Sequence, residues 1–173
     1  MLGGARSGKS LHAEGLLAGV QAATYVATAR RDPDDAEWTA RIAAHVARRP
    51  PEWRTVEPTD LAAVLRDAPA GDPPIMVDDL GTWLTGVLDD TGGWDGSLGP
   101  ARKAGTELAD AGGVCRAELV LVSAEVGLGV VPETRSGRLF RDELGALNAA
   151  VADRCTDVVL LIAGIPLRLK PGR

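Results

Sequence analysis

Aromatic residues, cysteines and long apolar runs are all scarce in this chain. Only six of its 173 residues are aromatic, four of them tryptophan, so alanine, valine and leucine must fill most of the core. Its two cysteines, Cys115 and Cys155, are too few for a disulfide framework and lack metal-ligand spacing, which favours reduced, partly buried thiols. The longest apolar run, Val158 to Ala163, is far too short to span a membrane, and no signal-peptide pattern opens the chain. We therefore expect a cytoplasmic protein without a membrane span.

Positive charge is scarce as well. The chain carries 19 Lys and Arg against 24 Asp and Glu, a formal net charge of −5, and it has no Lys/Arg-rich run. This balance argues against nucleic acid or a membrane surface as a partner. A nucleotide polyphosphate needs only local positive charge, so the acidic balance is compatible with nucleotide binding. The length, without an internal repeat or linker, favours a single domain with a sizeable core.

What the chain does have is a complete phosphate-binding loop close to its first residue. Residues 3–10 read GGARSGKS and match the pattern G-x-x-x-x-G-K-S. In this motif the glycines let backbone N–H groups point at a phosphate, Lys9 supplies charge to the outer phosphates, and Ser10 offers a hydroxyl to Mg²⁺. The helix-like segment 11–18 that follows presents its positive N-terminal end to the same anion. We predict nucleotide binding by Gly3, Gly4, Ala5, Arg6, Ser7, Gly8, Lys9 and Ser10.

Helix-like and strand-like segments alternate along the rest of the chain. The predicted helices cover residues 9–19, 35–48, 59–67, 80–89, 101–111 and 137–153, and the predicted strands cover 23–28, 53–57, 75–77, 118–122 and 157–163. Pro33 and Asp34 serve as start signals for the second helix, and residues 91–99, which include Trp94, are predicted to be a flexible surface loop. Apolar strands separated by helices are typical of a mostly parallel sheet covered on both faces. We therefore predict one α/β domain over residues 1–173, a three-layer fold of the P-loop NTPase type.

Polar residues follow three of the predicted strands: Thr28-Ala29-Arg30, Asp78-Asp79 and Ser123-Ala124-Glu125. Ligands of such sheets bind at the carboxyl ends of the strands. Asp78 directly ends the apolar strand 75–77, so we predict that it holds Mg²⁺, directly or through water, beside Ser10. The alternative is an ordinary helix cap at residues 78–79. Asp79 is the weaker metal candidate because it lies past the apolar run.

A second set of residues that could carry chemistry lies in residues 41–57. Arg41, His45 and Arg48 or Arg49 recur at helical spacing, so they share one face or edge. A neutral imidazole is a competent nucleophile toward phosphorus, and flanking guanidinium groups would hold the attacked phosphate. Taken alone, however, a histidine on a solvated helix is usually an ordinary surface residue.

The ordered series of motifs resembles the bifunctional adenosylcobinamide kinase / adenosylcobinamide-phosphate guanylyltransferase family of cobalamin biosynthesis. The series begins with GGARSGKS, YVATA at 25–29, R-I-x-x-H at 41–45, R-P at 49–50 and W-x-T-x-E at 53–57. It continues with V-D at 77–78, V-S-x-E-V-G-x-G-V-V-P-E at 122–133, R-L-F-R-D at 138–142 with Asn148, and A-G-I-P-L at 163–167. The resemblance covers nearly the whole chain, with a gap around residues 89–117.

The resemblance implies two reactions. In one, the γ-phosphate of ATP or GTP moves to the aminopropanol hydroxyl of adenosylcobinamide. In the other, a histidine attacks the α-phosphate of GTP, expels pyrophosphate and passes GMP to adenosylcobinamide phosphate. His45 matches the position of that histidine, whereas we assign His12 a structural or solvated role. The resemblance also implies a homotrimer.

The same matching extends the nucleotide site beyond the phosphate loop. It adds Thr28, Ala29, Arg30, Val46, Ala47, Arg48, Arg49 and Glu57. Arg48 and Arg49 are expected to stabilise charge on the polyphosphate. Our hypothesis for Glu57 is that its carboxylate accepts hydrogen bonds from the N1–H and amino group of guanine, a donor pattern that adenine lacks.

The chain departs from the family pattern at three places. Only Met1-Leu2 precede the loop where the family has an apolar strand, so we expect a truncated first strand, central in the sheet, and a true start upstream. Ala124 stands where family members commonly carry Asn, and Asp79 replaces a small or thiol-bearing residue. Guanylyl transfer is therefore a safer expectation than kinase activity. Two alternatives stay open: a P-loop small-molecule kinase without guanylyl transfer, and a nucleotide-dependent switch or binding module.

Overall fold

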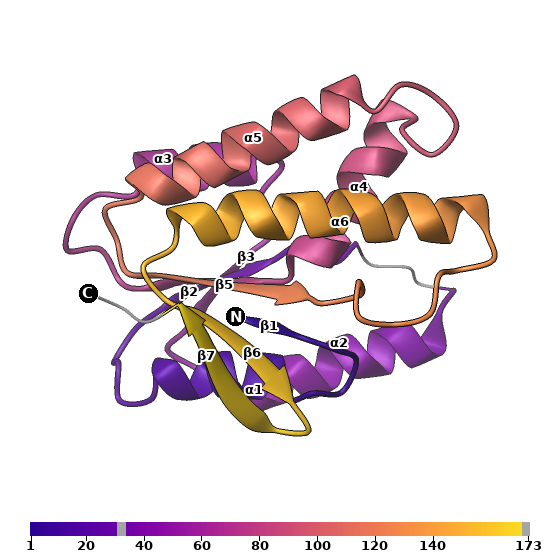
Figure 1. Cartoon of the computed structure of the whole chain (residues 1–173). Helices are drawn as coiled ribbons and strands as arrows, with labels where there is room; N and C mark the ends of the chain where they lie inside the picture. Colours follow the sequence, from indigo (N-terminus) through magenta and orange to yellow (C-terminus); the bar gives the residue numbers. More distant parts are fainter. Residues whose placement is uncertain (31–33, 171–173) are drawn as a thin grey trace.

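A single seven-stranded sheet forms the centre of the computed structural model, which describes residues 1–30 and 34–170 (Figure 1). Five side chains in the helix over residues 36–48 also lie outside this description: those of Glu37, Trp38, Arg41, His45 and Arg48. So does Pro33, the predicted helix start signal. In order across the sheet, the strands are β3 (Arg54–Val56), β2 (Thr24–Ala27), β4 (Ile75–Asp78), β5 (Leu119–Ala124), β1 (Leu2–Gly3), β6 (Val158–Ile162) and β7 (Ile165–Lys170).

All neighbouring strands are parallel except β6 and β7, which form an antiparallel hairpin. The mostly parallel sheet was predicted correctly, but the hairpin was missed. Its turn is Ala163-Gly164, where both residues have positive φ angles, 51° and 78°. Two such residues are typical of a tight hairpin turn, and the apolar-polar alternation over 165–170 was the sequence signal for the second strand.

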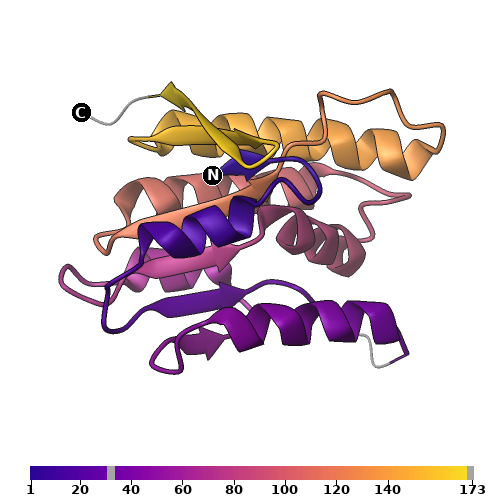
Figure 2. The same cartoon turned by 90° about the horizontal axis from the view of Figure 1, so that it is seen from below.

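Helices cover both faces of the sheet (Figures 1 and 2). On one face lie α1 (Lys9–Leu16) and α2 (Ala36–Arg48); on the other lie α3 (Leu61–Asp67), α4 (Leu80–Thr91), α5 (Gly99–Val114) and α6 (Arg135–Arg154). Every predicted helix is present, and the three-layer α/β prediction is confirmed. None of the helices in the described part of the chain is long and apolar enough to cross a membrane.

The core has one layer on each side of the sheet. The larger layer packs α3 to α6 against the strands and includes the fully buried Leu65, Leu88, Leu108 and Leu144. The smaller layer lies under α1. There Ala13 and Leu17 belong to the same cluster as Tyr25, Trp53 and Met76. Burying one leucine or valine side chain stabilises a fold by about 1.5–3 kcal/mol, so aliphatic residues suffice despite the shortage of aromatic ones.

Strand β1 is short but central. Leu2 pairs with Ser123 of β5 on one side and with Leu160 of β6 on the other. The backbone N–H of Glu125 donates to the carbonyl of Gly3 at 3.0 Å. Two residues are therefore enough to deliver the phosphate loop to the middle of the carboxyl edge, as the prediction of a short, central first strand requires.

The stretch 91–99 forms the predicted surface loop between α4 and α5, and side-chain contacts tie it to the neighbouring helices. Thr91 ends α4, and Gly99 begins α5. Between them, the Trp94 ring stacks on Phe140 with 6.5 Å between centroids, and its indole N–H donates to Asp89 Oδ1 at 2.6 Å. An indole anchored on α6 through Phe140 holds the glycine-rich turn in place, a contact that local composition does not reveal.

Candidate active site

The phosphate loop joins β1 to α1 at the carboxyl edge of the sheet. Gly8 has a φ angle of +89° immediately before α1, a conformation that glycine adopts without strain. A Cβ atom on Gly3 would collide with Ser7 Oγ and approach the carbonyl oxygen of Leu161 at 3.2 Å, so the loop leaves no room for a side chain there. The curled backbone that an anion-binding loop needs is therefore built into the fold.

Asp78 and Ser10 lie together, as predicted. Ser10 Oγ donates to Asp78 Oδ1 at 3.1 Å, and the hydroxyl of Tyr25 donates to Asp78 Oδ2 at 2.8 Å. A hydroxyl and a carboxylate are the hard oxygen donors that Mg²⁺ prefers, so this pair fits the ion. Within the described residues, no group of three or more His, Cys, Asp or Glu side chains is placed to hold a metal ion. Mg²⁺ usually keeps water and substrate phosphates among its ligands.

The neighbouring Asp79 has a different task. Its Oδ1 accepts the backbone N–H of Thr82 at 2.8 Å, which makes it the N-cap of α4. The helix cap expected at residues 78–79 is therefore made by Asp79, and Asp78 stays the predicted metal partner. Asp78 faces the phosphate loop, and Asp79 begins the helix.

The residues after β2 turn toward α4. Thr28 Oγ1 donates to the carbonyl of Asp79 at 2.7 Å and lies 2.6 Å from Thr82 Oγ1. Half-buried Ala29 follows it along the carboxyl edge. The Arg30 guanidinium forms an ion pair with Asp90 and donates to the carbonyl of Gly86 at 3.2 Å. These contacts hold the Arg30 side chain against α4.

Helix α2 carries His45 in its last turn, with Val46 and Ala47 exposed next to it. Its end is tied to the sheet through Arg49. The guanidinium carbon lies 3.6 Å from the centroid of the Tyr25 ring, and Nη1 donates to Thr55 Oγ1 at 2.8 Å. Arg49 therefore lies over β2 and β3. Its guanidinium, which was predicted to stabilise charge on the polyphosphate, also contacts the Tyr25 ring and Thr55.

Glu57 is exposed and directly follows β3, so it lies at the carboxyl edge of the sheet, next to the strand that carries Tyr25. The predicted residues thus divide into a phosphate-loop half, with Ser10 and Asp78, and an α2 half, with His45 and Arg49. Tyr25 contacts both halves.

Comparison with known proteins identifies this arrangement. The family model described as cobinamide kinase / cobinamide phosphate guanyltransferase matches residues 1–169. The chain belongs to this family. The resemblance inferred from the motifs is therefore confirmed.

Relatives in three bacteria are similar over nearly the whole chain. The bifunctional adenosylcobalamin biosynthesis protein CobP of Pseudomonas aeruginosa is 45% identical, over 98% of this chain and 95% of that relative. The bifunctional adenosylcobalamin biosynthesis proteins CobU of Escherichia coli and of Salmonella typhimurium are each 38% identical, over 97% of this chain and 97% of each relative.

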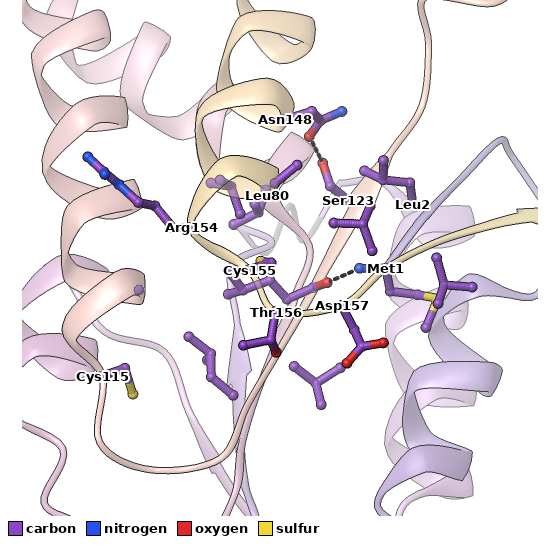
Figure 3. A pocket seen from close by; sticks show the side chains of 18 of the residues that line it. Met1, Leu2, Leu80, Cys115, Ser123, Asn148, Arg154, Cys155, Thr156 and Asp157 are labelled. Atoms are coloured by element: carbon purple, nitrogen blue, oxygen red, sulfur yellow. Dashed lines mark hydrogen bonds between the residues drawn. The ribbon is translucent and has the colours of Figure 1, made fainter. Parts of the chain in front are cut away.

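One buried polar residue near the phosphate loop was given no role by the sequence analysis. Asn148 of α6 is buried, and its Oδ1 accepts from Ser123 Oγ at 2.6 Å (Figure 3). Its Nδ2 donates to the carbonyl of Ala124 at 3.0 Å. These bonds hold the end of β5 beside the phosphate loop. A lone amide on an otherwise apolar helix face was the available signal, because buried polar groups are hydrogen-bonded.

A cavity of about 570 Å³ lies between β5, β6 and the ends of α5 and α6 (Figure 3). Its lining includes Met1, Cys115, Cys155 and Asp157, but no residue predicted for the nucleotide site of this family member. The Met1 amino group donates to the carbonyl of Leu121 at 2.8 Å, and burial lowers the pKa of that amino group. The cavity therefore contains no predicted nucleotide-binding residue, and it borders the end of β5 through Ser123 and Asn148.

Proposed function

We propose that this chain phosphorylates adenosylcobinamide and then transfers GMP from GTP to the product through a covalent adduct on His45. Membership of the cobinamide kinase / cobinamide phosphate guanyltransferase family supports both activities. The observation that carries the proposal is the Ser10–Asp78 contact on a phosphate loop, joined through Tyr25 to the end of the His45 helix. The phosphate loop would then bind the same polyphosphate that His45 attacks.

At the phosphate-loop half, backbone N–H groups of residues 3–10 and the Lys9 ammonium would hold the polyphosphate. Ser10 and Asp78 would hold Mg²⁺, which when bound neutralises charge on the phosphates and orients them. In the kinase step, the acceptor hydroxyl forms a bond to the γ-phosphorus, the bond from that phosphorus to the β-phosphate oxygen breaks, and the hydroxyl proton is lost.

At the α2 half, a neutral ring nitrogen of His45 forms a bond to the α-phosphorus of GTP. The bond to the β-phosphate oxygen breaks, pyrophosphate leaves, and the ring loses the proton on its other nitrogen to solvent. A phosphate oxygen of adenosylcobinamide phosphate then attacks the same phosphorus. The P–N bond breaks, and His45 regains its proton. Two easier displacements replace one direct condensation of two anions.

Around the nucleotide, Thr28, Ala29 and Arg30 and the segment Val46–Arg49 would border the site. The exposed carboxylate of Glu57 would accept guanine N1–H and its amino group. Adenine lacks that pair of donors, so Glu57 would select GTP for the adduct. The chain would assemble as a trimer, as the family resemblance implies, and light scattering measures that state directly.

Intact mass spectrometry after incubation with GTP and Mg²⁺ tests the proposal. The wild-type chain should gain the mass of one GMP, in a linkage that is labile to acid and stable to alkali, and His45→Ala should gain none. His12→Ala is the matched control and should be labelled like the wild type. If wild-type protein phosphorylates cobinamide but never gains GMP, the chain is a kinase alone. If it does neither, it is a binding module.

A further inference from the structure

Tyr25 lies between the two halves of the site, and no step above uses it. It is 3% exposed in the middle of β2, within the smaller core layer. Its hydroxyl donates to Asp78 Oδ2 at 2.8 Å, while its ring lies under the guanidinium of Arg49 at 3.6 Å. One buried side chain therefore touches the proposed metal carboxylate with its polar end and the anchor of α2 with its face.

Both contacts are held in a fixed geometry. The Tyr25 hydroxyl binds Oδ2 of Asp78, which leaves Oδ1 toward the Ser10 hydroxyl and restricts rotation of the carboxylate. Burial, and then the nearby charge of Asp78, raise the pKa of Tyr25 far above its ordinary value, so the phenol stays a hydrogen-bond donor. On the other side, the bond from Arg49 to Thr55 Oγ1 holds the guanidinium over the ring. A cation over an aromatic face is attracted to it.

We propose that Tyr25 is a positioning residue that couples Mg²⁺ binding at Asp78 to the placement of the His45 helix. This inference rests on the proposed function, since it takes Asp78 as a ligand of the Mg²⁺–nucleotide. The Tyr25 hydroxyl orients the Asp78 carboxylate toward Mg²⁺, and the Tyr25 ring holds the Arg49 guanidinium in place. The two roles are carried by different parts of the side chain, so they can be separated by substitution.

Tyr25→Phe removes the hydroxyl and keeps the ring. We expect the Mg²⁺ concentration that gives half-maximal binding of a fluorescent N-methylanthraniloyl GDP to rise roughly tenfold to a hundredfold, the worth of one hydrogen bond to a charged group. Nucleotide binding without Mg²⁺ should not change. GMP labelling at saturating Mg²⁺ should stay within about twofold of wild type, because the support for Arg49 is intact.

Tyr25→Leu removes both functions while keeping an apolar side chain in the core. We expect the same shift in Mg²⁺ dependence and, in addition, a loss of GMP labelling of about tenfold at saturating Mg²⁺. Arg49→Gln should cost less GMP labelling when added to Tyr25→Leu than when made in the wild type, because the contact with the ring is then already lost.

Trp53→Phe is the matched control. Trp53 is a buried aromatic residue of the same core layer, so its variant reports loss of packing without loss of the Asp78 contact. Unchanged Mg²⁺ dependence in Tyr25→Phe, or an equal shift in Trp53→Phe, overturns the role of Tyr25. If wild-type protein binds the nucleotide with no dependence on Mg²⁺, the proposed metal site itself is overturned, and this coupling with it.

Discussion

The two halves of the site are held in the fold in different ways. The phosphate loop leaves β1, which pairs with a strand on each side in the middle of the sheet. Helix α2 lies over the β2–β3 edge, and its end is secured by the side-chain contacts of Arg49 (Figure 2). Backbone pairing makes the first half a rigid phosphate cradle. The second half depends on a few side chains, so small changes there should alter guanylyl transfer separately from phosphate binding.

The largest effect is expected from a change in the phosphate-loop half, because both reactions depend on it. In Asp78→Asn, we expect both cobinamide phosphorylation and GMP labelling to fall by about a hundredfold or more, because the carboxylate that would hold the charge-neutralising Mg²⁺ is lost. Initial rates of the two reactions measure this. Asp79→Asn is the control: asparagine caps helices as well as aspartate does, so its rates should stay within about twofold of wild type. Equal losses in both variants would contradict the assignment of Asp78.

Gly3→Ala tests how tightly the cradle is packed. The new Cβ would meet Ser7 Oγ and the Leu161 carbonyl, so we expect the free energy of unfolding to fall by about 1–3 kcal/mol. Urea denaturation measures it. A Cβ on Gly4 has no neighbour within 4 Å, and Gly4→Ala should therefore unfold at nearly the wild-type urea concentration. If the two variants are equally stable, the cradle is looser than its geometry indicates.

Arg49→Gln tests the side-chain anchoring of the α2 half. We expect GMP labelling to slow by about tenfold while cobinamide phosphorylation changes little, because only the placement of His45 is disturbed. Labelling and phosphorylation rates are compared in the same preparation. Arg54→Gln changes an exposed arginine of β3 and should leave both rates unaltered. A parallel decline of the two reactions in Arg49→Gln would mean that Arg49 serves the shared polyphosphate.

Glu57→Gln should produce the smallest change. It tests whether the α2 half of the site also distinguishes guanine from adenine. A glutamine can accept only part of the guanine donor pattern, so we expect the preference for GTP over ATP in labelling to fall roughly threefold to tenfold. Competition between the two labelled nucleotides measures it. Glu52→Gln, an exposed site before β3, is the control. An unchanged preference removes Glu57 from guanine recognition.

Two parts of the site could be predicted from the sequence: residues that form one continuous motif, and residues that directly follow a predicted strand. The loop Gly3–Ser10 needs only its own spacing. Asp78 followed from the rule that parallel strands end at one edge, and its 3.1 Å contact with Ser10 confirms the proximity. The sequence also favoured Asp78 over Asp79 as the partner of Ser10, but it could not show that Asp79 caps α4, because that contact depends on where the helix begins.

The link through Tyr25 was invisible for a related reason. Strands β2 and β4 pair so that Tyr25 lies opposite Met76 and Ala27 opposite Asp78. Side chains two residues apart share a face, which brings the Tyr25 hydroxyl diagonally to Asp78. A shift of the register by one residue would have turned it away. The same holds for Trp94, whose order depends on Phe140 in a helix more than forty positions along the chain.

By itself, the sequence determined the fold class, the phosphate loop, the candidate nucleophile and the family, because each of these depends on periodicity, spacing or ordered motifs within the chain. The tertiary structure decided that Asp79 caps α4, which contacts Arg30 and Arg49 make, and that Tyr25 joins the two halves. Those outcomes depend on strand register and on contacts between distant elements. Such contacts exist only once the sheet has brought β2, β4 and the phosphate loop to one edge.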